Sequence, residues 1–467
     1  MTEKPEVTPT DASSRGPLLF LLFSGLVWLV VAGLLGLVAS IQLQSPEFLA
    51  DCPFVTYGRM REVAETAFVY GWLANGGLAL ALWVLGRLAG EPLRAQVWCV
   101  IGTLFWNLSV LEALGSVLAG DATGFPLLGL PGNFHLIMFV SYGAIAVSGL
   151  LAWAGRLRLL SYASQWYAAA ALFLFPWILS LAHVMLFSAP VRGVEQAVVA
   201  GWYSQCVLLL WLAPLALAVA YYVVPKMTGK ALPSYEFASL GFWTLILVGG
   251  LTGGRHLIGG PVPAWLGSVA VVSFALLLFH ALVVFLNLRS VFFGSGIALK
   301  FIAFGLAMYF IGAALSAATT FHSVAVRTEF THFSTAQDQL ALWGAFSTIF
   351  FGGIYYAVPR ISGRAWVSAG LVRAHLFLSI AGILLLFGSL TVAGIIQSQD
   401  LADPKIAFEE ITRHTHPWLL AATVAQAVFL LGSVAFAVNF VGTAFPFLKL
   451  SQPATFNQPS TMEAPVP

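Results

Sequence analysis

Apolar residues gather along the chain into twelve stretches, which short polar or glycine- and proline-containing segments separate. Each stretch is long enough for a membrane-spanning helix, which needs about 20 mostly apolar residues. The pattern therefore predicts an all-α integral membrane protein. The predicted spans are residues 17–43, 66–88, 95–119, 132–154, 161–187, 197–224, 237–254, 263–288, 298–319, 337–358, 368–396 and 416–446.

Little of the chain remains outside these spans, which favours a single integral domain. Residues 1–16 are a polar N-terminal tail, residues 17–446 the twelve-helix domain, and residues 447–467 a proline-containing tail that we expect to be disordered. The longest connections, 44–65 and 397–415, are too short for separate domains. The first span lacks a small-residue cleavage site, so we expect it to be retained as a helix.

An even number of spans places both termini on one side of the membrane. The tails and connections predicted on that side carry fourteen lysine and arginine residues, against seven on the opposite side. Positive residues concentrate in cytoplasmic loops. The charge bias therefore predicts that both termini lie in the cytoplasm.

The composition excludes several classes of protein. Hydrophobic residues make up 59% of the chain and charged residues only 9%, whereas soluble domains carry roughly 25% charged residues. The net charge of +2 does not fit a strongly basic nucleic-acid-binding protein. Cys52, Cys99 and Cys206 form neither a metal-binding pair nor a CxxCH motif, so the chain is not itself a c-type cytochrome.

Ionisable residues within the spans are the candidates for function, because burying a charge in a membrane is costly. Glu112 lies inside the third span, where it could act as a proton relay or as a hydrogen-bonded or protonated structural carboxyl. The nine histidines form no His-x-His, His-His or His-x-x-x-His motif inside a span. Haem or copper requires convergent histidines, so these patterns alone predict no metal centre.

Several segments resemble subunit I of the haem–copper oxidases, specifically the cbb3-type cytochrome c oxidases. Residues 193–203, GVEQAVVAGWY, look like the family's GVQDAMVQWWY, and residues 222–226, YVVPK, are similar to its YFVPK. The resemblance covers roughly residues 50–440, with twelve helices in the same order. Further matches are Ser234-Tyr235, Phe242-Trp243, Leu181-Ala182-His183-Val184, Tyr355-Tyr356-Ala357-Val358-Pro359 and His416-Pro417.

The resemblance also implies that most copper ligands are replaced. Where the family has a copper-binding histidine after Trp-Tyr-Gly, this chain has Gln205. The paired copper-binding histidines of Gly-Pro-His-His-Leu correspond to Arg255 and His256, so one of the two remains. The redox tyrosine expected six residues before that pair corresponds to Gly249. A cationic guanidinium and a neutral amide are poor substitutes for imidazole at a copper site.

The haem ligands depart from the family in the same way. The His-Val-His that supplies one ligand to each haem corresponds to Gln337-Asp338-Gln339, and the other low-spin haem ligand corresponds to Ala64. The glutamate of the family's Thr-Phe-Glu corresponds to His322, which could be a proton-relay or structural residue. Haem b and copper are expected from the family. Because only His256 remains of six histidine ligands, however, we predict no cofactor and no catalytic residue.

The replaced side chains would form a polar cluster. We expect Gln205, Arg255, His256, Gln337, Asp338 and Gln339 to converge in the outer half of the bundle. Arg255 and Asp338 would form a buried ion pair, and the glutamines would satisfy one another by hydrogen bonds. Such pairing is needed because a partly satisfied buried network costs more than none.

Three functions are compatible with this sequence. The first is a cofactor-poor structural or assembly subunit of a respiratory membrane complex, not an enzyme by itself. It would lie in a bacterial-type inner membrane beside other membrane subunits, including a membrane-anchored c-type cytochrome. The second is an active terminal oxidase or nitric-oxide-reductase-like enzyme with atypical ligands, including one haem held by His135 or His183. The third is a transporter or sensor, in which Glu112 and an Arg255–Asp338 pair line a polar path.

Overall fold

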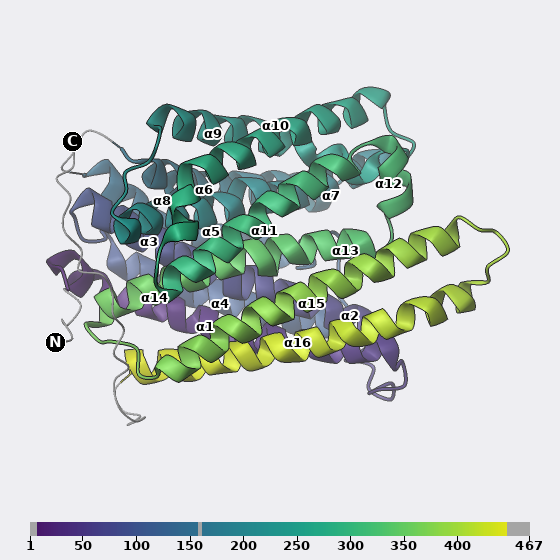
Figure 1. Ribbon diagram of the computed structural model, residues 1–467, viewed down its shortest axis with the longest axis horizontal. Coiled ribbons are helices and arrows are strands. Elements are labelled where there is room, and N and C mark those ends of the chain that lie inside the picture. Colours follow the sequence, from purple (N-terminus) through teal and green to yellow (C-terminus); the bar gives the residue numbers. More distant parts are fainter. Residues whose placement is uncertain (1–6, 157–160, 446–467) are drawn as a thin grey trace.

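The computed structural model describes residues 7–156 and 161–445, and these residues form a bundle of long helices that run back and forth along one axis (Figure 1). Its helices are α1 (Pro9–Gln44), α2 (Tyr57–Thr66), η1 (Ala67–Leu73), α3 (Ala74–Ala89), α4 (Gln96–Ala119), η2 (Gly132–Phe134), α5 (His135–Ala154), α6 (Ala163–His183), η3 (Val184–Ser188), α7 (Val194–Cys206), η4 (Val207–Leu212), α8 (Ala213–Thr228), α9 (Tyr235–Val248), η5 (Gly249–Leu257), α10 (Ala264–Leu288), η6 (Arg289–Phe293), α11 (Ile297–Thr319), α12 (His322–Thr328), α13 (His332–Gln339), η7 (Leu340–Ser347), α14 (Thr348–Ser362), α15 (Ala369–Leu401) and α16 (Phe408–Ala444).

The prediction of an all-α membrane protein with twelve spans is confirmed. Twelve continuous helical stretches among the described residues are long and apolar enough to cross a membrane. The start of α1 and the end of α16 lie at the same end of the bundle (Figure 1), where Phe23 and Phe445 pack edge to face at 5.4 Å. The opposite end is called the distal end below.

Three spans form the centre of the bundle. The apolar windows of Tyr57–Ala89, Val194–Thr228 and His332–Ser362 are 100%, 89% and 94% buried, whereas the other nine spans are between 28% and 56% buried. Helices that are apolar on every side are typical of the interior of a membrane bundle. These three spans carry Ala64, Gln205 and Gln337, whereas Arg255, at the remaining replaced copper-ligand position, lies in the span Tyr235–Leu257.

The central spans share a local change of helix type. Each span begins at the distal end as an ordinary α-helix and then continues into a wider π-helical segment, η1, η4 or η7. Each π-helical segment begins shortly after the position of a lost ligand, namely Ala64, Gln205 or Gln339. π-Helical turns are rare and are frequent at functional sites. The three helices therefore keep a shared backbone feature beside the replaced side chains.

The first helix begins earlier than the hydrophobic pattern predicts. α1 starts at Pro9, so part of the predicted 1–16 tail is helical, and Thr8 and Asp11 form a reciprocal capping box at its start. Asp11 is buried, and it accepts hydrogen bonds from Arg87 at 2.9 Å and from Trp83 at 2.9 Å. This ion pair ties the polar start of α1 to α3. The predicted tail at residues 447–467 lies outside the described residues.

The distal connections are also more helical than predicted. α2 occupies most of the second half of the predicted 44–65 connection, and α15 and α16 extend through much of the predicted 397–415 connection. The α15–α16 hairpin, coloured green to yellow, projects past the other helices at the distal end (Figure 1). At its tip the imidazole Nδ1 of His414 lies 2.9 Å from the carboxylate of Asp400.

Candidate functional site

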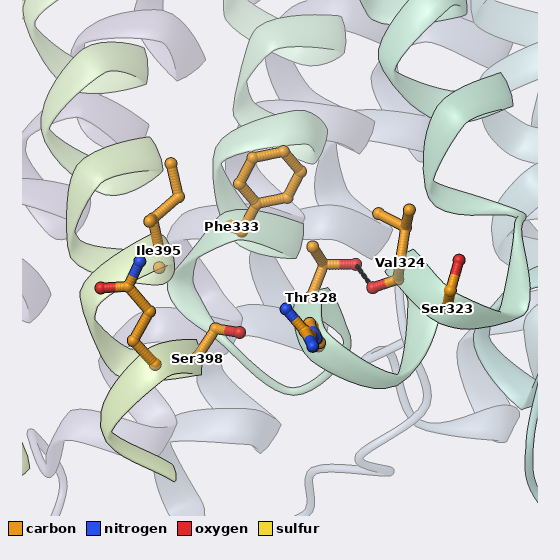
Figure 2. A pocket seen from close by; sticks show the side chains of 9 residues that line it. Ser323, Val324, Thr328, Phe333, Ile395 and Ser398 are labelled. Atoms are coloured by element: carbon orange, nitrogen blue, oxygen red, sulfur yellow. Dashed lines mark hydrogen bonds between the residues drawn. The ribbon is translucent and has the colours of Figure 1, made fainter. Parts of the chain in front are cut away.

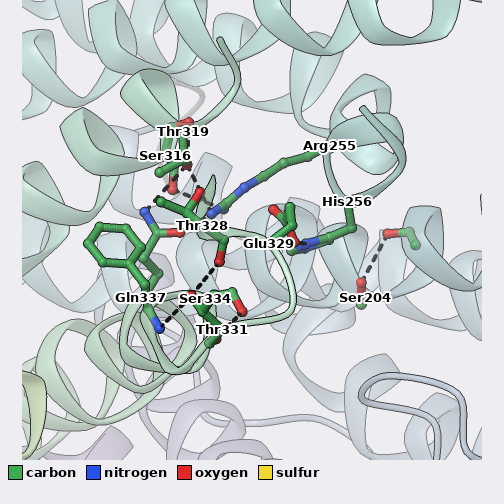
Figure 3. A network of polar contacts seen from close by, with 12 residues as sticks. Ser204, Arg255, His256, Ser316, Thr319, Thr328, Glu329, Thr331, Ser334 and Gln337 are labelled. Carbon is green, nitrogen blue, oxygen red and sulfur yellow. Dashed lines mark hydrogen bonds and ion pairs between the residues drawn. The ribbon is translucent and has the colours of Figure 1, made fainter. Parts of the chain in front are cut away.

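A polar cluster is centred on Arg255 and His256, whose side chains lie near Glu329 and Gln337 (Figure 3). Its side chains come from five segments: α7, η5, the end of α11, the connection between α12 and α13, and α13. The glycine-rich sequence 249–254 gives η5 its tight 3-10 form and its close contact with α7. A Cβ on Gly253 would lie 2.5 Å from the Trp202 Cα, so only glycine permits this approach.

Arg255 is the centre of the cluster. Its side chain is only 4% exposed, and its guanidinium donates hydrogen bonds to Ser316 Oγ at 3.2 Å, to Thr319 Oγ1 at 3.2 Å and to Gln337 Oε1. The guanidinium also lies over the Phe274 ring, 5.5 Å from its centroid. A buried cation is therefore held by neutral oxygens and by an aromatic face, with no carboxylate in direct contact among the described residues.

His256 is held from both sides. Its Nδ1 lies 3.1 Å from Glu329 Oε2, and its Nε2 lies 3.3 Å from the amide nitrogen of Gln205. A carboxylate can only accept, so Nδ1–H donates to Glu329 and Nε2 accepts from Gln205. Burial raises the pKa of Glu329, but the hydrogen bond that it accepts from His256 and the charge of Arg255 lower it, and its pKa lies below the ordinary 4.5.

Glu329 was missed by the sequence reasoning. It lies outside the spans and 73 residues from His256, and no motif marks it. The next residue, Phe330, has a left-handed backbone conformation with φ of +60° and a side chain that is 90% exposed. A positive φ is uncommon for a bulky residue and costs conformational energy. The turn thus directs Glu329 inward while Phe330 points out.

Two of the predicted contacts in the cluster are wrong. Arg255 and Asp338 do not form an ion pair, because the guanidinium donates a hydrogen bond to Gln337 instead of to the carboxylate of Asp338. The glutamines do not bond to one another either: Gln337 bonds to Arg255 and Thr319, and Gln205 bonds to His256. Consecutive residues of α13 point in directions about 100° apart, so only one of residues 337–339 can face Arg255.

The other two polar residues of α13 are not satisfied within the cluster. The Oε1 atom of Gln339 is buried without a hydrogen-bond partner among the described residues. Asp338 has no hydrogen bond or ion pair there, although it is close enough to Arg255 for electrostatic attraction. The six predicted residues therefore share one region, but four of them carry its hydrogen bonds.

Two further candidates lie away from the cluster. Glu112 is exposed on the outer surface of α4, and His322 is exposed on α12. Neither has a hydrogen bond or ion pair among the described residues. His135 and His183 do meet, with their Nδ1 atoms 3.3 Å apart, and they also bond to Leu130 O at 3.1 Å and Ser188 Oγ at 3.0 Å. This direct contact leaves no space for a haem between the two rings.

A groove of about 520 Å³ lies beside the cluster, between α12, the start of α13 and α15 (Figure 2). It offers no histidine, cysteine or carboxylate, so it lacks the side chains that bind haem iron or copper. Its lining residues are Ser323, Val324, Arg327, Thr328, Phe333, Gly394, Ile395, Ser398 and Gln399.

Comparison with known proteins establishes the family. Residues 17–428 match the family model for Cytochrome C and Quinol oxidase polypeptide I. The chain belongs to this family. It is 24% identical over 436 residues to the cbb3-type cytochrome c oxidase subunit CcoN1 of Stutzerimonas stutzeri, which covers 88% of this chain and 91% of the relative. It is also 24% identical to a cytochrome c oxidase subunit 1 homologue of Azorhizobium caulinodans, over 93% of this chain and 81% of the relative.

The fold agrees with that membership. A haem–copper terminal oxidase dimer solved by cryo-electron microscopy matches with a TM-score of 0.76 and 13% sequence identity, over 96% of this chain and 88% of the solved chain. Identity this low shows the fold alone. The resemblance deduced from short motifs is therefore confirmed at the level of the oxidase subunit I family and of its twelve-helix bundle.

The donor atoms in the cluster do not fit the copper of this family. Copper requires several imidazole donors, and His256 is the only histidine in the cluster. Its Nδ1 and Nε2 already bond to Glu329 and Gln205, and the cationic Arg255 is adjacent in sequence. Among the described residues, no group of three or more histidine, cysteine or acidic side chains is arranged to hold a metal ion.

The low-spin haem fits no better. Ala64 offers only a methyl group in place of an axial imidazole, and Gln337 is committed to Arg255. One helical turn further into the bundle, the rings of Phe68 and Trp343 stack with centroids 3.8 Å apart, and Trp343 packs edge to face on Phe429 at 4.0 Å. Aromatic side chains thus fill the space between the two central spans that would carry the haem ligands.

Neighbouring side chains also occupy the space beside Gly249, the position that corresponds to the redox tyrosine. A Cβ on Gly249 would lie 2.9 Å from Leu210 Cδ2 and 3.3 Å from Leu209 Cβ. A larger side chain there requires Leu210 to change its rotamer and Leu209 to shift. The side chains around the former ligand positions have therefore adjusted to the residues that this sequence contains.

Proposed function

We propose that this chain is a structural or assembly subunit of a respiratory membrane complex, built on the oxidase subunit I fold without the family's metal chemistry. The observation that carries the proposal is Arg255. Its buried guanidinium, hydrogen-bonded to Ser316, Thr319 and Gln337, stands where the resemblance places a copper ligand. A cation there repels a second cation, and the same hydrogen bonds join α11 and α13 to η5.

In this proposal the polar cluster replaces the metals as an internal cross-link. Arg255 connects η5 to α11 and α13, and His256 connects η5 to α7 and to the α12–α13 connection. These contacts unite two of the three central spans. The hydrogen bonds to the charged groups of Arg255 and Glu329 contribute about 1.5–3 kcal/mol each, so the cluster supports the distal half of the bundle.

The relatives suggest where the chain works. They are subunits of cytochrome c oxidases from bacteria, which supports placement in a bacterial inner membrane beside other membrane subunits. A membrane-anchored c-type cytochrome is the partner that the resemblance implies. The excess of positive charges near the termini supports their cytoplasmic location.

The decisive experiment measures haem and metal in the purified chain, separated from any cytochrome subunit. A pyridine haemochrome assay and copper analysis should find far less than one haem and one copper per chain. About one haem or more per chain would refute the proposal and favour an active oxidase or nitric-oxide-reductase-like enzyme with atypical ligands. Measurement of bound haem after haem-supplemented expression is the control against incomplete loading.

The transporter hypothesis loses its main support. It required Glu112 and an Arg255–Asp338 pair to line one path. Glu112 instead faces outward from α4, and Arg255 is paired with Gln337 inside the bundle. An ion-dependent flux in vesicles containing the purified chain would nevertheless be direct evidence for it.

A further inference from the structure

Glu112 is a carboxylic acid on the outer surface of the bundle at the depth of the membrane interior. It lies seven residues before the end of α4 at Ala119, which is about 10 Å along the helix axis. α4 has 24 residues and is therefore about 36 Å long, slightly more than the roughly 30 Å hydrocarbon core. The backbone of Glu112 consequently lies several ångströms inside the hydrocarbon region.

The interior of the bundle does not use this side chain. The opposite face of α4 carries the polar contacts to neighbouring helices, where Asn107 accepts a hydrogen bond from Trp28 at 2.7 Å and one from Asn75 at 3.1 Å. Glu112 is exposed and has no hydrogen bond or ion pair among the described residues. Exposed charged residues elsewhere in the candidate spans lie closer to a helix end.

The helix surface around Glu112 carries small residues. Gly115 follows one turn later, and a Cβ placed on it would meet nothing within 4 Å. Ala119 continues this line of small residues on the exposed face, and Leu111, 57% exposed, flanks it. Small residues allow the backbone of another membrane helix to approach closely, and polar side chains hydrogen-bond across such interfaces.

We propose that the α4 face formed by Leu111, Glu112, Gly115 and Ala119 docks a transmembrane helix of another subunit. That helix presents a hydrogen-bond donor, such as a lysine, arginine, histidine or hydroxyl side chain, to the Glu112 carboxyl. The reason is the charge: an ionisable side chain facing lipid is costly, and such residues usually find a partner or face a protein interior. The partner helix supplies the donor that this chain lacks and covers Gly115.

This inference deepens the proposed function, and it rests on that proposal only for the role of the docked helix in a respiratory complex. The docking surface itself depends on Glu112 and Gly115, not on the absence of haem. Haem content and helix docking are therefore separate measurements, and either proposal can fail alone.

Photo-crosslinking in native membranes tests the docking surface. A photoreactive phenylalanine analogue replaces Leu111, and a control replaces Phe377, which is 71% exposed on α15. We expect the probe at position 111 to link to one other membrane protein, within a transmembrane segment that carries a donor within one turn of the linked residue. The probe at position 377 should not give that adduct. Links only to lipid, or to a second copy of this chain, would overturn the proposal.

Two pairs of variants test the chemistry of the contact. Glu112→Leu should reduce the adduct at least tenfold, whereas Glu112→Gln, which still accepts a hydrogen bond, should retain more than half of it. Gly115→Leu should abolish the adduct by blocking the close approach. Gly143→Leu on α5 is the matched control, because a Cβ there also meets nothing within 4 Å. Unchanged yields with Glu112→Leu and Gly115→Leu, in protein that remains monodisperse, would refute the docking surface.

Discussion

The pairing of Arg255 with Gln337 predicts a specific pattern of energetic coupling. Arg255→Met removes the guanidinium and keeps an unbranched side chain, while Gln337→Leu removes the amide with little change in volume. Each single change leaves one buried polar partner, because the two residues are 4% and 5% exposed. A buried group that loses its partner costs about 1–3 kcal/mol.

The double variant should be more stable than the sum of the single changes. Replacing both partners by apolar groups of similar shape can be nearly neutral, so we expect a coupling energy of about 1–3 kcal/mol between positions 255 and 337. Coupling between Arg255→Met and Asp338→Leu should be smaller, since that carboxylate does not contact the guanidinium. Thr319 retains a hydrogen bond to Leu315 O at 3.0 Å in every variant, which limits the damage.

Unfolding in mixed micelles, titrated with SDS and followed by tryptophan fluorescence, measures these free energies. Two double-mutant cycles are compared, one joining positions 255 and 337 and the other joining positions 255 and 338. If the second coupling energy exceeds the first, the ion pair expected from the sequence is the real contact, and the hydrogen-bonded arrangement described above is wrong.

Three further predictions concern other contacts. The pKa of Glu329 lies below its ordinary 4.5. Its ionised form therefore stabilises the fold above about pH 4.5, and this contribution disappears as the pH falls through the lower pKa of the folded state. Glu329→Gln should make the thermal stability less dependent on pH between about pH 3 and pH 6. Gly249→Tyr should destabilise the protein by about 1–3 kcal/mol through overpacking, and Leu210→Ala in the same chain should restore part of that loss in an SDS titration. Asp11→Ala should cost about 3–5 kcal/mol, because it leaves the Arg87 guanidinium without its buried carboxylate, and thermal denaturation in detergent measures the loss.

Each of these has a control or a contrary outcome. A wild-type and a Glu329→Gln protein with the same acid profile would show that another carboxyl governs the pH response. Gly249→Tyr protein with unchanged stability would mean that Leu209 and Leu210 repack without cost. Glu91→Ala is the control for Asp11→Ala, because the Arg94–Glu91 pair is more exposed and should contribute about 0–1 kcal/mol.

The sequence predicted which residues share the candidate site, but not which of them bond to one another. The motifs around Gln205, His256 and Gln337 resembled the family closely enough to place all three near one another. The hydrogen-bond partners within the cluster could not be predicted in this way. Asp338 was the obvious partner for Arg255 by charge, yet α13 turns Gln337 toward the guanidinium. Glu329 escaped notice because its partner is 73 residues away and no periodicity links the two.

The sequence by itself determined the number, order and approximate limits of the twelve spans and the family to which they belong. Those properties depend on runs of about 20 apolar residues and on local motifs, which a single chain records directly. Only the tertiary structure decided which side chains meet. It paired Arg255 with Gln337, His256 with Glu329 and Asp11 with Arg87, and it turned Glu112 outward from α4. Helix rotation and packing set these choices, because neighbouring residues on a helix differ by about 100° in direction.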